Sequence, residues 1–95
     1  MPILSIKSGL LKRIYEAGGP VWEDELVKAT MEAEGVFSDY WKWTIRYYMM
    51  EMLANGMIDA VEYKLGDESN FGSEHSIAKY QINDFGKMKV ESMLL

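Results

Sequence analysis

The chain contains no cysteine, which excludes disulfides, thiolate zinc sites and cysteine nucleophiles. It has a single histidine, His75, so no second imidazole is present to share a metal ion. No apolar run approaches the roughly 20 residues that a membrane-spanning helix needs, and no secretory signal precedes the first expected helix. We therefore expect a cytoplasmic protein with no membrane partner, no metal and no cofactor.

Motifs of known enzyme classes are also missing. The sequence holds no glycine-rich phosphate loop, no nucleophile elbow and no paired-carboxylate motif in a suitable setting. Asp67, Ser69 and Gly72 match three positions of a calcium-binding loop, but Phe71 and Ala78 stand where that loop needs oxygen ligands. We expect no catalytic residues and no enzyme activity.

Positive charge is scarce, with 10 basic against 15 acidic residues and a formal net charge of −5. No third of the chain is basic. This balance counts against a function that rests on broad attraction to phosphates. The acidic run Glu23-Asp24-Glu25 is expected in the solvated first turn of a helix, where carboxylates favour the positive end of the helix dipole.

What the sequence does contain is enough apolar residues, spread along all 95 positions, for one folded domain covering 1–95. Apolar residues at three-and-four spacing predict helices over about 4–17, 22–35, 38–55 and 83–95. Ser38 is the expected N-cap of the third helix, and Gly56 is expected to end it in the left-handed conformation. Asn83 is the expected cap of the last helix.

Two stretches of alternating residues predict strands, at about 57–65 and 79–82. The polar segment 66–76 between them is expected to be a mobile loop at a hairpin tip. Val21–Trp22 is interpreted either as a short strand or as a hydrophobic staple before the second helix. In that second helix, Leu26, Ala29 and Ala33 are expected on the buried side together with Trp22.

The third helix has two apolar faces. Ile45, Tyr48, Met49 and Met52 are expected in the core, while the opposite face, expected to be exposed, carries cations beside aromatic residues and methionine. If this face meets DNA, arginine suits a guanine edge, hydroxyls suit phosphates, and the aromatic rings suit thymine methyls or sugars. The candidate DNA-binding residues of this helix are Ser38, Lys42, Trp43, Thr44, Arg46 and Tyr47.

Two alternatives stand beside DNA binding. Trp43 and Tyr47 also suit a wider core or a subunit contact, and with Met50 they suit anchors for a protein partner. The hairpin tip offers acidic residues to a phosphate backbone, and three weaker DNA contacts remain at its base: Lys64, His75 and Lys79.

A homodimer is expected from surplus apolar residues at both ends of the chain. The first helix has a second apolar edge beside its core stripe, and the last helix carries more apolar residues than one face requires. The candidate dimer-interface residues are Ile3, Leu4, Leu11, Tyr15, Met88, Met93, Leu94 and Leu95.

Two segments carry a resemblance to a known family: Met52-Leu53-Ala54-Asn55-Gly56-Met57-Ile58 and Tyr80-Gln81-Ile82-Asn83-Asp84-Phe85-Gly86-Lys87. They resemble the winged-helix transcription regulators of the MarR and PadR type over nearly the whole chain, and also small archaeal winged-helix proteins without an assigned regulon. The positions that match the family pattern are Met52, Ile58, Tyr80, Ile82, Asn83 and Gly86.

The resemblance implies an α+β, mainly α, winged helix-turn-helix with three helices, a two- to three-stranded hairpin wing and a C-terminal helix. The helix-turn-helix would cover about 22–55, the wing about 57–82 and the last helix about 83–95. It further implies a homodimeric transcriptional regulator that binds specific duplex DNA sequences through Lys42, Trp43, Arg46 and Tyr47, with the terminal helices pairing about a two-fold axis. The alternative is a winged-helix protein-interaction module that does not bind DNA.

Overall fold

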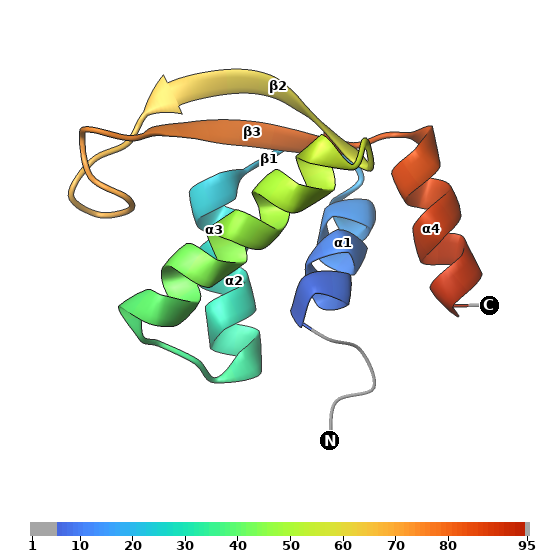
Figure 1. The fold of residues 1–95 in the computed structure, drawn as a ribbon, viewed down its shortest axis with the longest axis horizontal. Helices are drawn as coiled ribbons and strands as arrows, with labels where there is room; N and C mark the ends of the chain where they lie inside the picture. Colours follow the sequence, from blue (N-terminus) through green and yellow to red (C-terminus); the bar gives the residue numbers. More distant parts are fainter. Residues whose placement is uncertain (1–5, 95) are drawn as a thin grey trace.

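The computed structural model describes residues 6–94 and contains four helices and three strands (Figure 1). The side chains of Met93 and Leu94 also lie outside the described part. In chain order the elements are α1 (Ile6–Ala17), β1 (Val21–Trp22), α2 (Glu23–Glu34), α3 (Asp39–Ala54), β2 (Ile58–Leu65), β3 (Ser76–Ile82) and α4 (Asp84–Leu94). The expected α+β, mainly helical class is confirmed, as are the approximate positions of the elements.

The three strands form one antiparallel sheet in the order β1-β3-β2. Val21–Trp22 is a strand, because Val21 pairs with Tyr80 and Trp22 with Lys79. The β2–β3 pairing shifts register between Ala60 and Glu62, where β2 carries an additional residue. In Figure 1 the sheet lies across one end of the helices, with β2 as the strand farthest from them.

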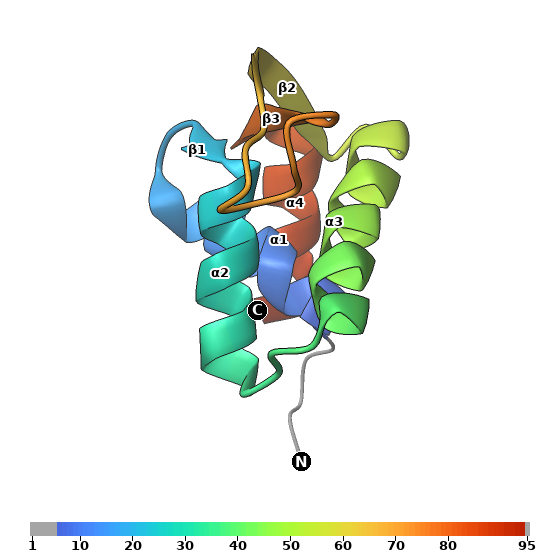
Figure 2. The ribbon, with the colours of Figure 1, turned by 90° about the vertical axis from the view of Figure 1, so that its left-hand side faces the viewer.

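The core lies where α1, α2 and α3 meet the inner face of the sheet (Figure 2). The sheet and three of the helices, α1, α3 and α4, contribute its fully buried apolar residues, and α2 adds two buried ones: Leu10, Ile14, Ile45, Met49, Met52, Ile58, Ile77 and Val90, with Leu26 and Val27 from α2. Along the part of the chain that is described, no helix has the length and apolar character needed to cross a membrane.

The two segments that carried the resemblance contact each other directly. The Asn83 side chain donates a hydrogen bond to the Gly56 carbonyl (2.7 Å) and accepts one from the Gly86 backbone N–H (2.9 Å), which confirms it as the cap of α4. The Asn83 backbone N–H donates to the Met57 carbonyl (3.3 Å). Gly56 has a φ of 77°, as expected for a left-handed residue that ends α3. These bonds fix where α4 begins relative to the end of α3.

One expectation about the core is wrong. Ala29 and Ala33 of α2 are exposed, and the buried residues of this helix are Glu23, Leu26, Val27 and Thr30. The helix is therefore rotated so that its acidic N-terminal residue, Glu23, faces the core.

We predict that Gly86→Ala lowers the free energy of unfolding by about 2 kcal/mol or more, because an added Cβ would collide with the Met57 carbonyl and press on the Ile82 side chain. Gly9→Ala in α1 is the matched control, since a Cβ there meets no atom within 4 Å. The control is expected to be neutral or to stabilise by up to about 1 kcal/mol. Urea denaturation followed by circular dichroism measures both. Equal stability of the two variants would contradict the close approach at Gly86.

Candidate functional site

The candidate site is the outward face of α3. The helix begins after Ser38, whose hydroxyl accepts a hydrogen bond from the Trp41 N–H (3.4 Å), so the expected N-cap is confirmed. Asp39 stands in the first turn, where its charge complements the helix dipole. The sequence predicts that one face of this helix is exposed and contacts DNA. In the structure, other parts of the fold cover some residues of that face and leave the others exposed.

Arg46 belongs to the covered part, and the expectation that it lies on an exposed face is wrong. The whole residue is only 6% exposed. Arg46 Nε lies 3.0 Å from Glu23 Oε2, and Arg46 Nη2 donates a hydrogen bond to the Ser76 carbonyl (2.6 Å). The guanidinium that was expected to read a guanine edge is thus held inside the fold between α2, α3 and β3.

Glu23 is buried as well, against the expectation of a solvated acidic run. Its Oε1 accepts a hydrogen bond from the Ala78 backbone N–H (3.0 Å), and its Oε2 faces Arg46. Burial raises the pKa of Glu23 above its ordinary value, although the Ala78 N–H and the Arg46 charge both favour the ionised form. Burial and the nearby Glu23 charge also raise the pKa of Tyr80 to about 12. The rotation of α2 follows from this pairing, which turns Glu23 inward.

The β2–β3 loop, residues 66–75, does not have the structure expected of a mobile hairpin tip. Asn70 and Phe71 are buried. The Asn70 side-chain oxygen accepts hydrogen bonds from the N–H groups of Asp67 (2.8 Å) and Phe71 (2.6 Å), and the Asp67 carbonyl accepts one from Gly72 (2.8 Å). The Ser69 hydroxyl and N–H both bond to the Asp67 carboxylate, which lowers the pKa of that carboxyl. Backbone polar groups of the loop therefore have partners within the loop.

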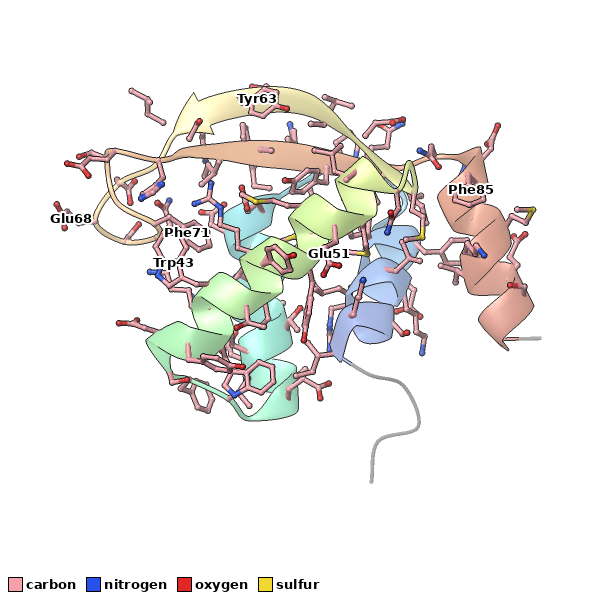
Figure 3. All side chains as sticks on the ribbon, viewed as in Figure 1. Trp43, Glu51, Tyr63, Glu68, Phe71 and Phe85 are labelled. Atoms are coloured by element: carbon pink, nitrogen blue, oxygen red, sulfur yellow. The ribbon has the colours of Figure 1, made fainter. Side chains whose placement is uncertain are left out.

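Phe71 connects this loop to α3 (Figure 3). Its ring centroid lies 5.1 Å from that of Trp43 and 4.5 Å from the Arg46 guanidinium carbon. Lys42 Nζ lies 5.1 Å from the same ring, and the His75 ring packs 5.2 Å from Trp43. The loop thus covers one side of the α3 face, and it brings Glu68 and Glu74 with it.

The remaining candidate DNA-binding residues have other partners. The Thr44 hydroxyl donates to the Tyr40 carbonyl (2.6 Å). The Nζ atoms of Lys64 and Lys79 lie 4.2 Å and 5.3 Å from the Trp22 ring, and Lys79 also lies 3.6 Å from a Glu62 carboxylate oxygen. Of the three candidate residues on the hairpin, Lys64 and Lys79 thus lie beside Trp22 on the sheet, and His75 lies in the β2–β3 loop.

The candidate dimer residues fall into three groups. Leu11 is buried in the core of its own chain, so the expectation that it forms an exposed edge is wrong. Tyr15 packs against that core, and its hydroxyl donates to Glu91 of α4 (3.2 Å). Met88 is exposed, whereas Ile3, Leu4 and Leu95, with the side chains of Met93 and Leu94, lie outside the described part. The second apolar edge of α1 is thus occupied by its own C-terminal helix.

The open part of the α3 face is an apolar line, which we call the α3 stripe: Tyr40, Trp43, Tyr47 and Met50. These side chains are between 41% and 70% exposed. Their spacing of three, four and three residues places them on one side of the helix. Phe37, just before the helix, extends the line and is also exposed. An exposed row of this kind marks an interaction surface more often than a solvated one.

A groove of about 590 Å³ lies beside the first turns of the α3 stripe, between α2, the start of α3 and the loop. Val27, Met31, Phe37 and Phe71 give it an apolar lining. Asp24, Glu25 and Glu32 stand along it, opposed by Lys28 and Lys42. The charged lining of the groove thus consists of three carboxylates and two lysines. Within residues 6–94, no group of three or more acidic or histidine side chains is arranged to hold a metal ion.

Sequence reasoning missed Tyr40 and Phe71 as site residues. The three-four-three spacing from Tyr40 to Met50 could have indicated Tyr40. The presence of a single aromatic residue in an otherwise polar loop could have indicated Phe71. Comparison of the chain with models of protein families, with curated proteins and with solved structures finds no match.

We predict that Glu23 makes stability depend on pH. Because the pKa of Glu23 is raised in the folded state, the folded protein binds more protons than the unfolded chain between the ordinary pKa, near 4.5, and the raised value. The contribution of Glu23 to the free energy of unfolding is therefore fully present below that window and lost as pH rises through it. Urea denaturation from acid to neutral pH measures this, with Glu23→Gln as the non-titrating reference. The quantity compared is the difference in free energy of unfolding between the native protein and Glu23→Gln. If this difference does not change with pH, or grows in favour of the native protein as pH rises, the raised pKa is contradicted.

We also predict that Phe71→Ala frees the β2–β3 loop. Removing the ring takes away its contacts with Trp43, Lys42 and Arg46, so amide hydrogen exchange at Gly72 and His75 is expected to accelerate about tenfold or more. The loss of global stability is expected to be about 1–3 kcal/mol. Glu68→Ala, in the same loop but exposed, is the matched control and should leave exchange unchanged. Equal exchange rates in both variants would show that Phe71 does not anchor the loop.

Proposed function

We propose that this protein is an interaction module that binds a basic, amphipathic helical segment of a partner protein along the α3 stripe. The observation that carries the proposal is the exposed row from Tyr40 to Met50, which lies on the α3 face beside an acidic loop and an apolar groove. Aromatic residues and methionine are enriched at protein interfaces, and three-four spacing suits an opposing helix.

We infer that the architecture presenting this row is a winged helix-turn-helix. The order of helices and strands, the turn between α2 and α3, and the β2–β3 hairpin support that inference. In this arrangement α3 is the outward helix, and the loop of the hairpin is the tip of the wing. Such a fold serves protein recognition as well as DNA recognition, so the choice between them depends on the side chains.

The charge around the α3 stripe favours a basic partner. Acidic residues stand on the same helix, at Asp39 and Glu51, and on the loop, at Asp67, Glu68 and Glu74. Glu51 is partly neutralised by Lys7, whose Nζ lies 3.4 Å from its carboxylate, and Lys42 lies over the Phe71 and Trp43 rings. Arg46 faces a buried carboxylate and has little free charge to offer. The negative charge of these residues attracts a partner that carries lysine or arginine beside its apolar face, and it repels a phosphate backbone.

Sequence-specific binding of duplex DNA in transcriptional control remains the second candidate function. The α2–turn–α3 arrangement favours it, because such a pair of helices places its second helix in a major groove. Lys42, Trp43 and Tyr47 would then be the contacts at the helix, with Lys64 and Lys79 near the hairpin.

We predict that the protein binds a synthetic leucine–lysine amphipathic helix, with leucines at three-four spacing, more tightly than the matching leucine–glutamate helix or a pool of random duplexes at low salt. Tyr47→Ala should weaken this binding about tenfold or more, since a central aromatic anchor is removed. Isothermal titration calorimetry measures all three ligands.

Phe85→Ala is the matched control, because Phe85 is an exposed aromatic residue on α4, away from the α3 stripe (Figure 3). It should leave the affinity unchanged. Duplex binding that is tighter than peptide binding and is lost in Lys42→Ala would favour the DNA candidate. Equal affinity for the basic and the acidic helix, or equal effects of Tyr47→Ala and Phe85→Ala, would overturn the proposal.

A further inference from the structure

The sheet has a free edge that the proposed function does not use. β2 is the outer strand of the order β1-β3-β2, and within residues 6–94 no strand pairs with its other side. In Figure 1 the start of β2 lies against the end of α3, and the rest of the strand runs along the margin of the sheet. An unpaired edge of this kind presents backbone N–H and C=O groups to any strand that can align with it.

The side chains of this edge strand are unusual for an unpartnered edge. Val61, Tyr63 and Leu65 alternate along it and are between 49% and 75% exposed. Natural edge strands are normally blunted by proline, by charge or by a bulge. Residues 61–65 contain no proline, and the bulge of β2 lies at the start of this stretch, between Ala60 and Glu62, so Tyr63 to Leu65 keep a regular register with β3. The two charged residues between them are of opposite sign, Glu62 and Lys64.

Residues 61–65 are complementary to themselves in the antiparallel direction. In a pairing centred on Tyr63, Val61 stands opposite Leu65 of a second copy, and Tyr63 stands opposite its own equivalent. Glu62 then stands opposite Lys64, and Lys64 opposite Glu62. Both charge pairs are of opposite sign and both outer pairs are apolar, which is the combination that stabilises neighbouring strands.

We propose that two copies of this chain associate through β2, edge to edge and antiparallel, about a two-fold axis at Tyr63. The product is a continuous six-stranded sheet in the order β1-β3-β2-β2-β3-β1. The association closes at two copies, because the contact uses the same edge of each chain and because the outer strand β1, with two residues, offers too short an edge for further growth.

The contacts within one chain are compatible with this arrangement. Glu62 lies 3.6 Å from Lys79 of β3, and Lys64 Nζ lies 4.2 Å from the Trp22 ring. Lys79 and Trp22 are themselves paired residues of β3 and β1. The charged side chains of β2 are therefore held along one face of the sheet, beside the edge that a second copy would meet.

Charge reversal tests the register directly. Sedimentation equilibrium of the full chain at about 100 μM should show a dimer. Glu62→Lys alone and Lys64→Glu alone each place like charges opposite one another, and each should weaken the dimer about tenfold or more. Mixing these two variants should form a heterodimer, since one strand then carries only basic and the other only acidic residues. The double variant Glu62→Lys/Lys64→Glu should restore the homodimer.

Glu34→Lys and Lys87→Glu make the same charge changes at exposed positions on α2 and α4 and should leave the dimer unchanged. Circular dichroism melting identifies any variant that fails to fold, and the heterodimer and the double variant keep the test valid in that case. A monomer at this concentration would overturn the proposal. So would a dimer that tolerates both single reversals, because it would use another surface. None of these outcomes depends on peptide or DNA binding at the α3 stripe.

Discussion

The buried pair of Glu23 and Arg46 is the interaction on which the rest of the arrangement depends. It joins the start of α2 to the middle of α3, and each partner also bonds to the β3 backbone, at Ala78 and Ser76. Burying two charges is expensive, so the value of such a pair lies more in fixing an arrangement than in adding stability. Here the pair fixes the rotation of α2 and the position of β3 relative to α3. It also holds the planar Arg46 guanidinium in the place where the Phe71 ring packs against it.

Much of the fold could be predicted from the sequence because its signals are local. Ser38, Gly56 and Asn83 act within one helical turn of themselves, and their residue types state that role directly. The candidate site was less predictable. Arg46 was expected outside because an arginine is normally exposed, and only a carboxylate from a distant helix makes its burial favourable. Phe71 was expected in solvent because no property of its own segment reveals the aromatic and cationic surface of α3 beneath it.

The same pair decides what kind of surface α3 offers. A winged helix that binds DNA needs free cations on its outward helix and on its hairpin. Here the arginine of α3 is neutralised inside, while Phe71 brings an acidic loop down beside Trp43. The apolar residues of the face remain open, and their surroundings become negative. These charges are the reason why the proposed function names a cation-bearing protein segment as the partner in preference to a polyanion.

The α3 stripe and the β2 edge lie on different elements, and α3 sits beneath the sheet whose outer margin is β2 (Figure 1). In the proposed dimer, pairing at the edge leaves both stripes open, so the two stripes are related by the two-fold axis. A partner with two suitable helical segments would then bind the second stripe at the effective concentration set by its linker. If both proposals hold, modest affinity at each stripe is sufficient for stable assembly with a partner that repeats its segment.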